Sequence, residues 1–352
     1  MNNNHDRDGF IPNNLLKKLA ERGNENAKKT LIETKEIKNN AKEEKKNNIT
    51  HSIAERNIEG LSKRLIYDSK GAKKFKYKLV RKEGDPPASD EIANIAYDFC
   101  GKTLEYLKNK LERNSIDDNG MDVICNIHFG EKDFNNAIWK FNQLSLGDGD
   151  GETFINLARS IDVVAHEIAH GVTQFTNDLY YGFQSGALNE HFSDVIGSAV
   201  QQFVKGQTAQ TADWLIGDEV VGPKFRGKAI RSMKAPGTAS DYDDQVANMK
   251  DYVELDNTEE DDFGGVHINS GIPNRAFFLV SQEIGTDSAA FLWYNALKNK
   301  EIIHYHATFN DAFKAIFETS KKLVSEGKLP QNTSSVVENA FEEVGIYALA
   351  IL

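Results

Sequence analysis

The 352-residue sequence has little cysteine, little proline, no long apolar run and no excess of positive charge. Cys100 and Cys125 are its two cysteines, and two cysteines outside a CxxC pair cannot build a disulfide framework. No apolar stretch approaches the roughly 20 residues that cross a bilayer, so we expect no membrane span. The formal net charge of −11 argues against nucleic acid as a partner, because phosphate binding needs a basic face. We expect a soluble globular protein that is a monomer.

The first sixty residues differ in composition from the rest. They hold twelve Lys or Arg against ten Asp or Glu, so the acidity belongs to the remainder of the chain. Apolar residues at 15–19 and 31–32 indicate short amphipathic helical turns, whereas the Lys, Glu and Asn run at 35–48 is typical of a solvated linker. No cationic segment followed by an apolar one stands at the start, so we expect no secretory signal peptide. We interpret residues 1–60 as an N-terminal appendage with its linker.

From about Leu65 the pattern is that of a folded protein with strands first and helices later. Alternating residues around a glycine turn at 63–84 predict a β-hairpin, and 121–130 is strand-like. Helical spacing is found at 91–112 and then repeatedly at 160–176, 186–204, 271–284, 286–299, 308–323 and 334–342. This order predicts an α+β fold with two lobes, a β-rich lobe at 61–180 and a mainly α-helical lobe at 181–352.

The segment SIDVVAHEIAHGVTQF contains the pattern H-E-x-x-H at His166, Glu167 and His170. Residues four apart on a helix share one face, so the two imidazoles can converge on one cation. Glu167 is then placed to activate a water molecule beside the metal. A polar stripe on an otherwise apolar helix needs compensation, which a metal ion supplies.

A catalytic zinc of this type needs a third protein ligand, and the next helical segment offers one. Glu190 and Asp194 lie one turn apart in NEHFSD, so one carboxylate can bind the metal. The other can accept the free N–H of a ligating histidine and thereby fix its tautomer. His191 points about 100° away from Glu190 on a helix, and we expect it at the surface.

These two helical motifs resemble those of the thermolysin family of zinc metallopeptidases. Further segments match that family in the same order: FNNAIW (134–139), which resembles its substrate-binding edge strand, GDGDGETF (147–154), YYGF (180–183), RSM (231–233), DFGGVHINSGIPN (262–274) and FEEVGI (341–346). The resemblance covers about residues 65–352. It implies a two-lobed thermolysin-like fold with one zinc in the cleft between the lobes, and an endopeptidase acting on peptides or proteins.

The resemblance also implies roles for individual residues. Glu167 would take the proton of the attacking water and pass it to the leaving amine. Tyr181 and His267 would donate to the developing oxyanion, with Asp262 orienting His267. The supporting residues would be Asn189 beside His170, and Asn136 (side chain), Ala137 (carbonyl) and Arg231 (guanidinium) along the substrate backbone.

Specificity and calcium follow from the same resemblance. The pocket for the residue after the cut bond would be formed by Phe154, Leu157, Val163, Ile216 and Ile230. These residues are all apolar, so we expect cleavage on the N-terminal side of bulky hydrophobic residues. Asp162, Asp213 and Asp218 fit the family's paired calcium site, but Gln201 stands where a bridging glutamate is expected. We therefore expect at most one calcium ion there.

The N-terminal appendage resembles a known element as well. GFIPNNLL (9–16) is similar to the short propeptide of the protealysin-like subgroup, which lacks a signal peptide, although Asn13 and Asn14 depart from its usual Pro and Tyr. This resemblance implies an inactive precursor whose own N-terminal segment acts as an intramolecular inhibitor. It also implies secretion by a route without a classical signal peptide, with a cytoplasmic location as the alternative.

Two other functions compete with that of a peptidase. A non-catalytic descendant would bind peptides without cutting them, but Glu167, Tyr181 and His267 are all present. A zinc hydrolase of non-peptide substrates is the second alternative. The retained peptide-holding residues Asn136 and Arg231 argue against it.

Overall fold

The computed structural model describes residues 9–46 and 62–347, and side chains up to residue 39 in the first of these ranges. The chain divides into two compact units. Unit 1 comprises Met1–Gly171 and Gly217–Lys228, and unit 2 comprises Val172–Ile216 and Ala229–Leu352. The division falls inside one helix at Gly171, and the described part of the N-terminal segment belongs to unit 1. The functional borders expected at residues 60 and 180 stay predictions.

Unit 1 is built on a five-stranded sheet in the order β2-β1-β3-β5-β4. Its strands are β1 (Arg64–Ala72), β2 (Lys78–Lys82), β3 (Val123–Phe129), β4 (Ala137–Lys140) and β5 (Gln143–Leu146). The three central strands are parallel, and each outer strand pairs antiparallel with its neighbour. Helix α3 (Glu91–Leu111) contacts β1 and β3. Strand β4 is thus an edge strand, as FNNAIW predicted.

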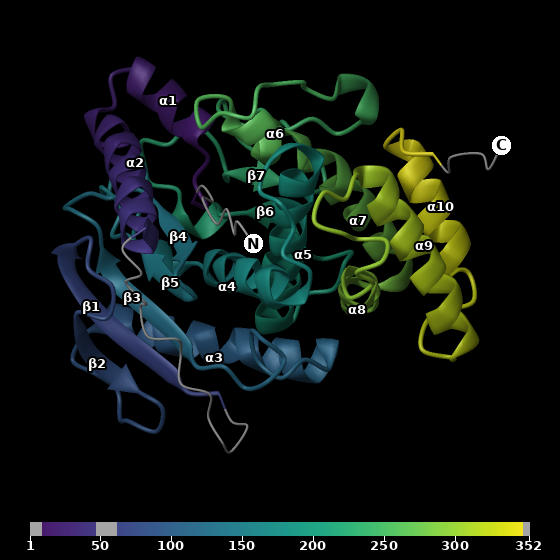
Figure 1. The fold of residues 1–352 in the computed structure, drawn as a ribbon, viewed down its shortest axis with the longest axis horizontal. Coiled ribbons are helices and arrows are strands. Elements are labelled where there is room, and N and C mark those ends of the chain that lie inside the picture. Colours follow the sequence, from purple (N-terminus) through teal and green to yellow (C-terminus); the bar gives the residue numbers. More distant parts are fainter. Residues whose placement is uncertain (1–8, 47–61, 348–352) are drawn as a thin grey trace. The chain divides into compact units, whose positions relative to one another are not determined.

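The N-terminal segment forms two helices, α1 (Asn13–Glu21) and α2 (Glu25–Lys46), which pack on each other, and α2 lies beside β4 in unit 1 (Figure 1). The expectation of a linker from residue 35 was wrong as far as Lys46, because this stretch is helical. Ile37 explains why, since it packs in one core cluster with Phe129, Phe134 and Ile138. Tertiary packing stabilises a helix whose polar composition alone would not. The remaining linker residues and the border at residue 60 lie outside the described residues.

Unit 2 is a helix bundle around α5 (Phe183–Lys205), which is buried from Ser185 to Gln202. Helix α5 contacts α6 (Asp262–Asn269), α7 (Gly271–Ile284), α8 (Thr286–Leu297) and α9 (Phe309–Ser325), and α10 (Thr333–Glu343) packs on α7 and α9. A two-stranded ribbon pairs β6 (Leu215–Ile216) with β7 (Arg231–Ser232). The structure also has three short 3₁₀ helices, of which Leu157–Arg159 and Asp218–Val220 belong to unit 1 and Met249–Asp251 belongs to unit 2. The α+β fold is therefore as predicted.

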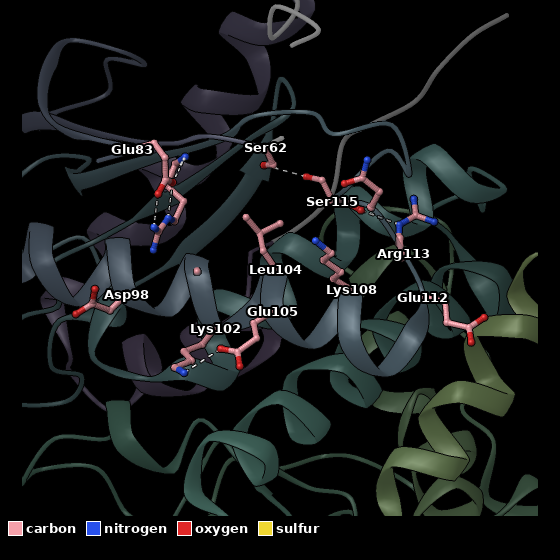
Figure 2. A pocket seen from close by; sticks show the side chains of 13 residues that line it. Ser62, Glu83, Asp98, Lys102, Leu104, Glu105, Lys108, Glu112, Arg113 and Ser115 are labelled. Atoms are coloured by element: carbon pink, nitrogen blue, oxygen red, sulfur yellow. Dashed lines mark hydrogen bonds and ion pairs between the residues drawn. The ribbon is translucent and has the colours of Figure 1, made fainter. Parts of the chain in front are cut away.

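A hollow of about 960 Å³ lies beside α3 in unit 1 (Figure 2). Four of its charged residues are paired with one another, Arg64 with Glu83 at 2.5 Å and Lys102 with Glu105 at 2.9 Å. None of the predicted catalytic residues lines it. The candidate catalytic site is therefore at the H-E-x-x-H helix and not in this hollow. Separately, no described helix has both the length and the apolar character to cross a membrane.

Candidate metal centre

Helix α4 (Ile161–Thr176) carries the two histidines of the H-E-x-x-H motif one turn apart. The ring centroids of His166 and His170 are 4.7 Å apart with their planes at 89°, and both residues are buried. Glu167 follows His166 on the same helix and is fully buried. The apolar positions Val164 and Ile168 are buried too, so α4 is a core helix with a polar stripe.

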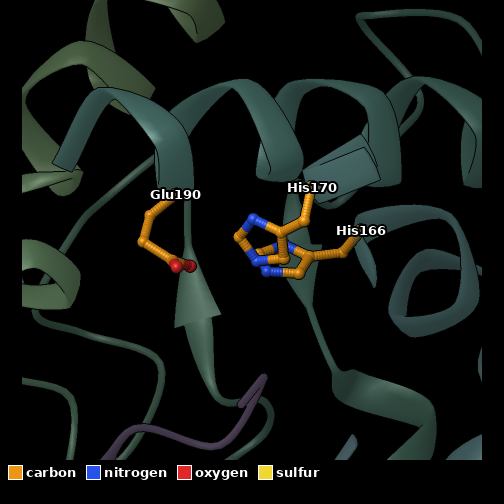
Figure 3. Close-up of side chains that lie close together, drawn as sticks. All are labelled: His166, His170 and Glu190. Carbon is orange, nitrogen blue, oxygen red and sulfur yellow. The ribbon is translucent and has the colours of Figure 1, made fainter. Parts of the chain in front are cut away.

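His166, His170 and Glu190 form the one group of possible metal ligands in the described part of the chain (Figure 3). Each offers one ligand atom, and these atoms all lie within 4.8 Å of one another. Two imidazole nitrogens and one carboxylate oxygen are the protein ligands of a catalytic zinc with a position left for water. All three residues are buried, where a metal ion offsets the cost of burying polar atoms. The donor set therefore fits one zinc ion, which confirms the predicted metal group.

Two further residues of unit 2 converge on the carboxylate of Glu190. The Tyr181 hydroxyl donates to Glu190 Oε1 at 2.5 Å, and His267 Nε2 lies 3.4 Å from Glu190 Oε2. Asp262 accepts twice from His267, from its backbone N–H at 2.8 Å and from ring Nδ1 at 2.6 Å. The imidazole is therefore held in one orientation by the Asp262 carboxylate.

A left-handed stretch of backbone makes this double contact possible. The φ angles of Asp262, Phe263, Gly264 and Gly265 are 53°, 49°, 84° and 76°. The chain thus turns back so that the Asp262 side chain meets the start of the helical turn that carries His267. Two of the four positions are glycine, the residue that adopts positive φ at the lowest cost.

Asp194, expected to accept from a ligating histidine, is bonded to two other side chains in unit 2. Arg231 donates to both of its oxygens, from Nε at 3.1 Å and from one terminal nitrogen at 2.9 Å. Asn274 donates to the same carboxylate at 2.9 Å. Asn189, the other expected supporting residue, donates to the Leu179 carbonyl at 3.5 Å. The roles assigned to Asp194 and Asn189 toward the histidines stay predictions.

The expectation that His191 lies at the surface was wrong, because the residue is only 1% exposed. It contacts Asn274 through Nδ1 at 2.7 Å and Trp293 through Nε2 at 2.7 Å. A surface position would require that one face of α5 meet solvent, whereas helices of unit 2 surround α5. Burial lowers the pKa of His191 to about 4, so the imidazole is neutral at pH 7.

The edge of β4 is already occupied by the N-terminal segment. The Phe10 N–H donates to the Ala137 carbonyl at 3.0 Å. The Asn136 side chain accepts from the Ile11 N–H at 2.8 Å and donates to the Ile11 carbonyl at 3.1 Å. The Phe10 ring meets His166 edge to face, with ring centroids 5.2 Å apart. Residues 9–11 therefore lie along the edge of β4 beside a predicted zinc ligand, held by one backbone hydrogen bond and two hydrogen bonds to the Asn136 side chain.

The residues predicted to form the specificity pocket are all buried, with at most 1% exposure: Phe154, Leu157, Val163, Ile216 and Ile230. Of the predicted calcium ligands, Asp162 is fully buried and accepts from Ser160 and from the Gly217 N–H at 2.6 Å. Burial raises the pKa of Asp162 to about 6, helped by the nearby charge of Asp218. Asp213 is exposed and accepts from the Leu215 N–H at 3.1 Å. The calcium site stays a prediction.

Comparison with known protein families accounts for nearly the whole chain. The family model for the thermolysin metallopeptidase catalytic domain matches residues 24–174, and the model for the thermolysin metallopeptidase alpha-helical domain matches residues 177–346. The fold and the metal group thus define a zinc metallopeptidase, an enzyme that hydrolyses peptide bonds. The chain belongs to the thermolysin family, whose members use catalytic zinc and calcium.

Individual relatives agree with this assignment. Protease PrtS from Photorhabdus sp. (strain Az29) is 37% identical over 359 residues, which cover 98% of this chain and 93% of that protein. An extracellular metalloprotease from Pectobacterium carotovorum subsp. carotovorum is 39% identical over 295 residues, 82% of either chain. Among solved structures, the precursor of protealysin, a metalloproteinase from Serratia proteamaculans, is 35% identical with a TM-score of 0.83, covering 96% of this chain and 99% of that one.

Proposed function

We propose that this metallopeptidase is an endopeptidase that cuts before bulky hydrophobic residues and is made as a precursor blocked by its own N-terminal segment. The observation that carries the proposal is the pairing of Phe10 and Ile11 with Asn136 and Ala137. Asn136 and Ala137 are the residues assigned to hold the substrate backbone. A substrate and the segment therefore compete for the same hydrogen bonds.

The residues of the chain divide the work of hydrolysis among them. Zinc, when bound, acidifies a water molecule and polarises the carbonyl to be attacked. Glu167 is the general base, and it later returns the proton to the leaving amine. Tyr181 and His267, which meet at Glu190, donate to the negative charge that develops on the substrate oxygen. Asp262 stabilises the charged form of His267 by accepting from Nδ1.

Blocking by the N-terminal segment is supported by contacts well beyond residues 9–11. The Glu33 carboxylate accepts from the Glu131 N–H at 2.6 Å, and Thr30 Oγ accepts from the Asn135 N–H at 3.1 Å. Ile37 adds an apolar anchor in the cluster described above. The segment is thus docked as a folded element, not only as an extended strand. The similarity to a solved precursor supports the same conclusion.

Substitution of Gly9 is expected to loosen the block. A Cβ atom at Gly9 would clash with the Ala137 carbonyl oxygen and with Asn136 Oδ1, so Gly9→Val must displace residues 9–11 from the edge of β4. Loss of one or two hydrogen bonds, each contributing about 1 kcal/mol, should raise the initial peptidase rate of the full-length chain about tenfold. The initial rate is measured with a quenched fluorescent peptide, at times when the protein still has the mass of the full-length chain.

The matched control is Glu21→Val, which adds the same side chain at an exposed position of the same segment. We expect its initial rate to equal that of the wild type. Equal rates for Gly9→Val and Glu21→Val would contradict the proposed block.

Hydrophobic specificity is supported by the five buried apolar residues assigned to the pocket and by the segment itself. Phe10, whose N–H bonds to Ala137, is a bulky hydrophobic residue of the kind we expect after the cut bond. In a peptide library, Leu, Ile and Phe should exceed Asp and Lys at that position by about 10²-fold or more, because burying a charge without a partner costs several kcal/mol. A preference for acidic or basic residues there would contradict the proposal.

The remaining parts of the proposal concern processing and location. We place the functional borders at about residues 60 and 180, giving a removable segment at 1–60 and lobes at 61–180 and 181–352. The protein would be secreted without a classical signal peptide and act as a monomer, without nucleic acid or a membrane as partner. Asp162, Asp213 and Asp218 would hold at most one calcium ion, because Gln201 replaces a charged bridging ligand.

A further inference from the structure

A row of buried polar side chains in unit 2 continues from the Asp194–Arg231 pair through Asn274 and His191 to Trp293. Asn274 on α7 donates from Nδ2 to Asp194 Oδ2 at 2.9 Å. His191 Nδ1 lies 2.7 Å from Asn274 Oδ1. Trp293 on α8 donates from its indole N–H to His191 Nε2 at 2.7 Å. Every residue of this row is at most 2% exposed: Asp194, Arg231, Asn274, His191 and Trp293.

The Trp293 indole at the end of the row determines which group donates in each of its hydrogen bonds. The indole of Trp293 can only donate, so His191 Nε2 accepts and carries no proton. The proton of a neutral imidazole is then on Nδ1, which donates to Asn274 Oδ1. With its oxygen so engaged, the Asn274 amide presents its N–H₂ group to Asp194. A reversed amide would place donor against donor at His191 and acceptor against acceptor at Asp194.

We propose that His191 is a positioning residue for peptide hydrolysis, acting through Asn274 and Asp194 on the guanidinium of Arg231. This inference rests on the proposed function, in which Arg231 donates to a substrate carbonyl. Asp194 Oδ2 accepts from both Arg231 Nε and Asn274, so the plane of the carboxylate is set by two donors rather than one. A bidentate guanidinium turns with the carboxylate that it grips. His191 thereby fixes the orientation of the Arg231 guanidinium, which the proposed function assigns to a substrate carbonyl.

Two substitutions of His191 separate positioning from mere packing. In His191→Asn the amide nitrogen takes the place of Nδ1 and can still donate to Asn274. In His191→Gln the amide oxygen takes the place of Nε2, so it can still accept from Trp293, but the donor to Asn274 is lost. Each variant keeps one of the two hydrogen bonds, so both should lose thermal stability by similar amounts.

The kinetic parameters of the two variants should differ nevertheless. For the self-processed enzyme with one zinc per chain, His191→Gln should lower kcat/KM for peptides about tenfold, mainly through KM, because a misplaced Arg231 holds the substrate backbone less well. His191→Asn should stay within about twofold of the wild type. Equal kcat/KM values for the two variants would overturn the positioning role, because a packing residue gives no reason for them to differ.

The tautomer supplies a test that needs no activity. In the full-length chain labelled with ¹⁵N-histidine, the His191 signals, identified by their loss in His191→Asn, should show a protonated Nδ1 and an unprotonated Nε2. A protonated Nε2 would overturn the row as described. An inactive wild-type enzyme would overturn the proposed function, whereas an active wild type with kinetically equal variants would overturn this inference alone.

Discussion

Replacement of Glu167 by glutamine is expected to lower kcat/KM for peptide hydrolysis by a factor of about 10³. Glu167 is fully buried, lies next to His166 on α4 and is not one of the three metal ligands. Glutamine keeps the size of the side chain but cannot accept the proton of the attacking water. The zinc content should therefore remain at one ion per chain while the chemical step is lost.

This prediction is measured with a quenched fluorescent peptide and metal analysis of the same samples. Glu342→Gln is the matched control, since it makes the same change at an exposed position of α10 and should leave both quantities unaltered. If Glu167→Gln kept more than a tenth of the wild-type rate, a different general base would be required.

Removal of the metal should reduce hydrolysis at least as much as Glu167→Gln does. Loss of an ion that contributes several kcal/mol of transition-state stabilisation corresponds to a fall of at least about 10³-fold in rate. A zinc chelator should produce this loss in the wild type, and added zinc should reverse it. His170→Ala removes one of the three ligands and should be inactive with little bound zinc, because two ligands hold the ion poorly.

His304→Ala controls for the loss of a histidine, because that side chain is 53% exposed and lies outside the metal group. It should bind zinc and hydrolyse peptides like the wild type. Zinc should also raise the melting temperature of the wild type but not of His170→Ala, since a ligand that binds only the folded state stabilises it. Chelator-resistant hydrolysis would contradict a zinc mechanism.

The elements that carry the metal ligands could be predicted from the sequence because their signals are local. Helical periodicity identified α4 and α5, and the spacing of His166 and His170 placed both imidazoles on one face. Alternation identified the β1–β2 hairpin, and a strand-like run identified β3. In each of these cases the secondary structure that the residue pattern predicts is the one that the chain adopts.

The errors arose where packing, not pattern, decides the structure. Helix α2 continues through a Lys, Glu and Asn run because Ile37 reaches the sheet, a contact between residues far apart in sequence. His191 is buried because helices surround α5, so no face of it meets solvent. The partners of Asp194 were missed for the same reason, since Asn274 is eighty residues away.

The docking of residues 9–11 could be predicted in part. The similarity of GFIPNNLL to a propeptide indicated an inhibitor, but not the atoms through which it acts. Those atoms are the Asn136 side chain and the Ala137 carbonyl, to which Ile11 and Phe10 are hydrogen-bonded. An unpaired sheet edge accepts any extended backbone, so sequence alone does not specify which segment pairs with it.

The central claim, an active zinc endopeptidase held back by its own N-terminal segment, is tested most directly by intact mass over time. Purified wild-type chain of 39.4 kDa, incubated with zinc, should lose a fragment by cleavage between about residues 45 and 65 while its peptidase activity rises in step. Glu167→Gln should stay at full length throughout. A wild-type chain that keeps its full mass, and is inert even after residues 1–60 are removed, would contradict the account and favour a peptide-binding protein.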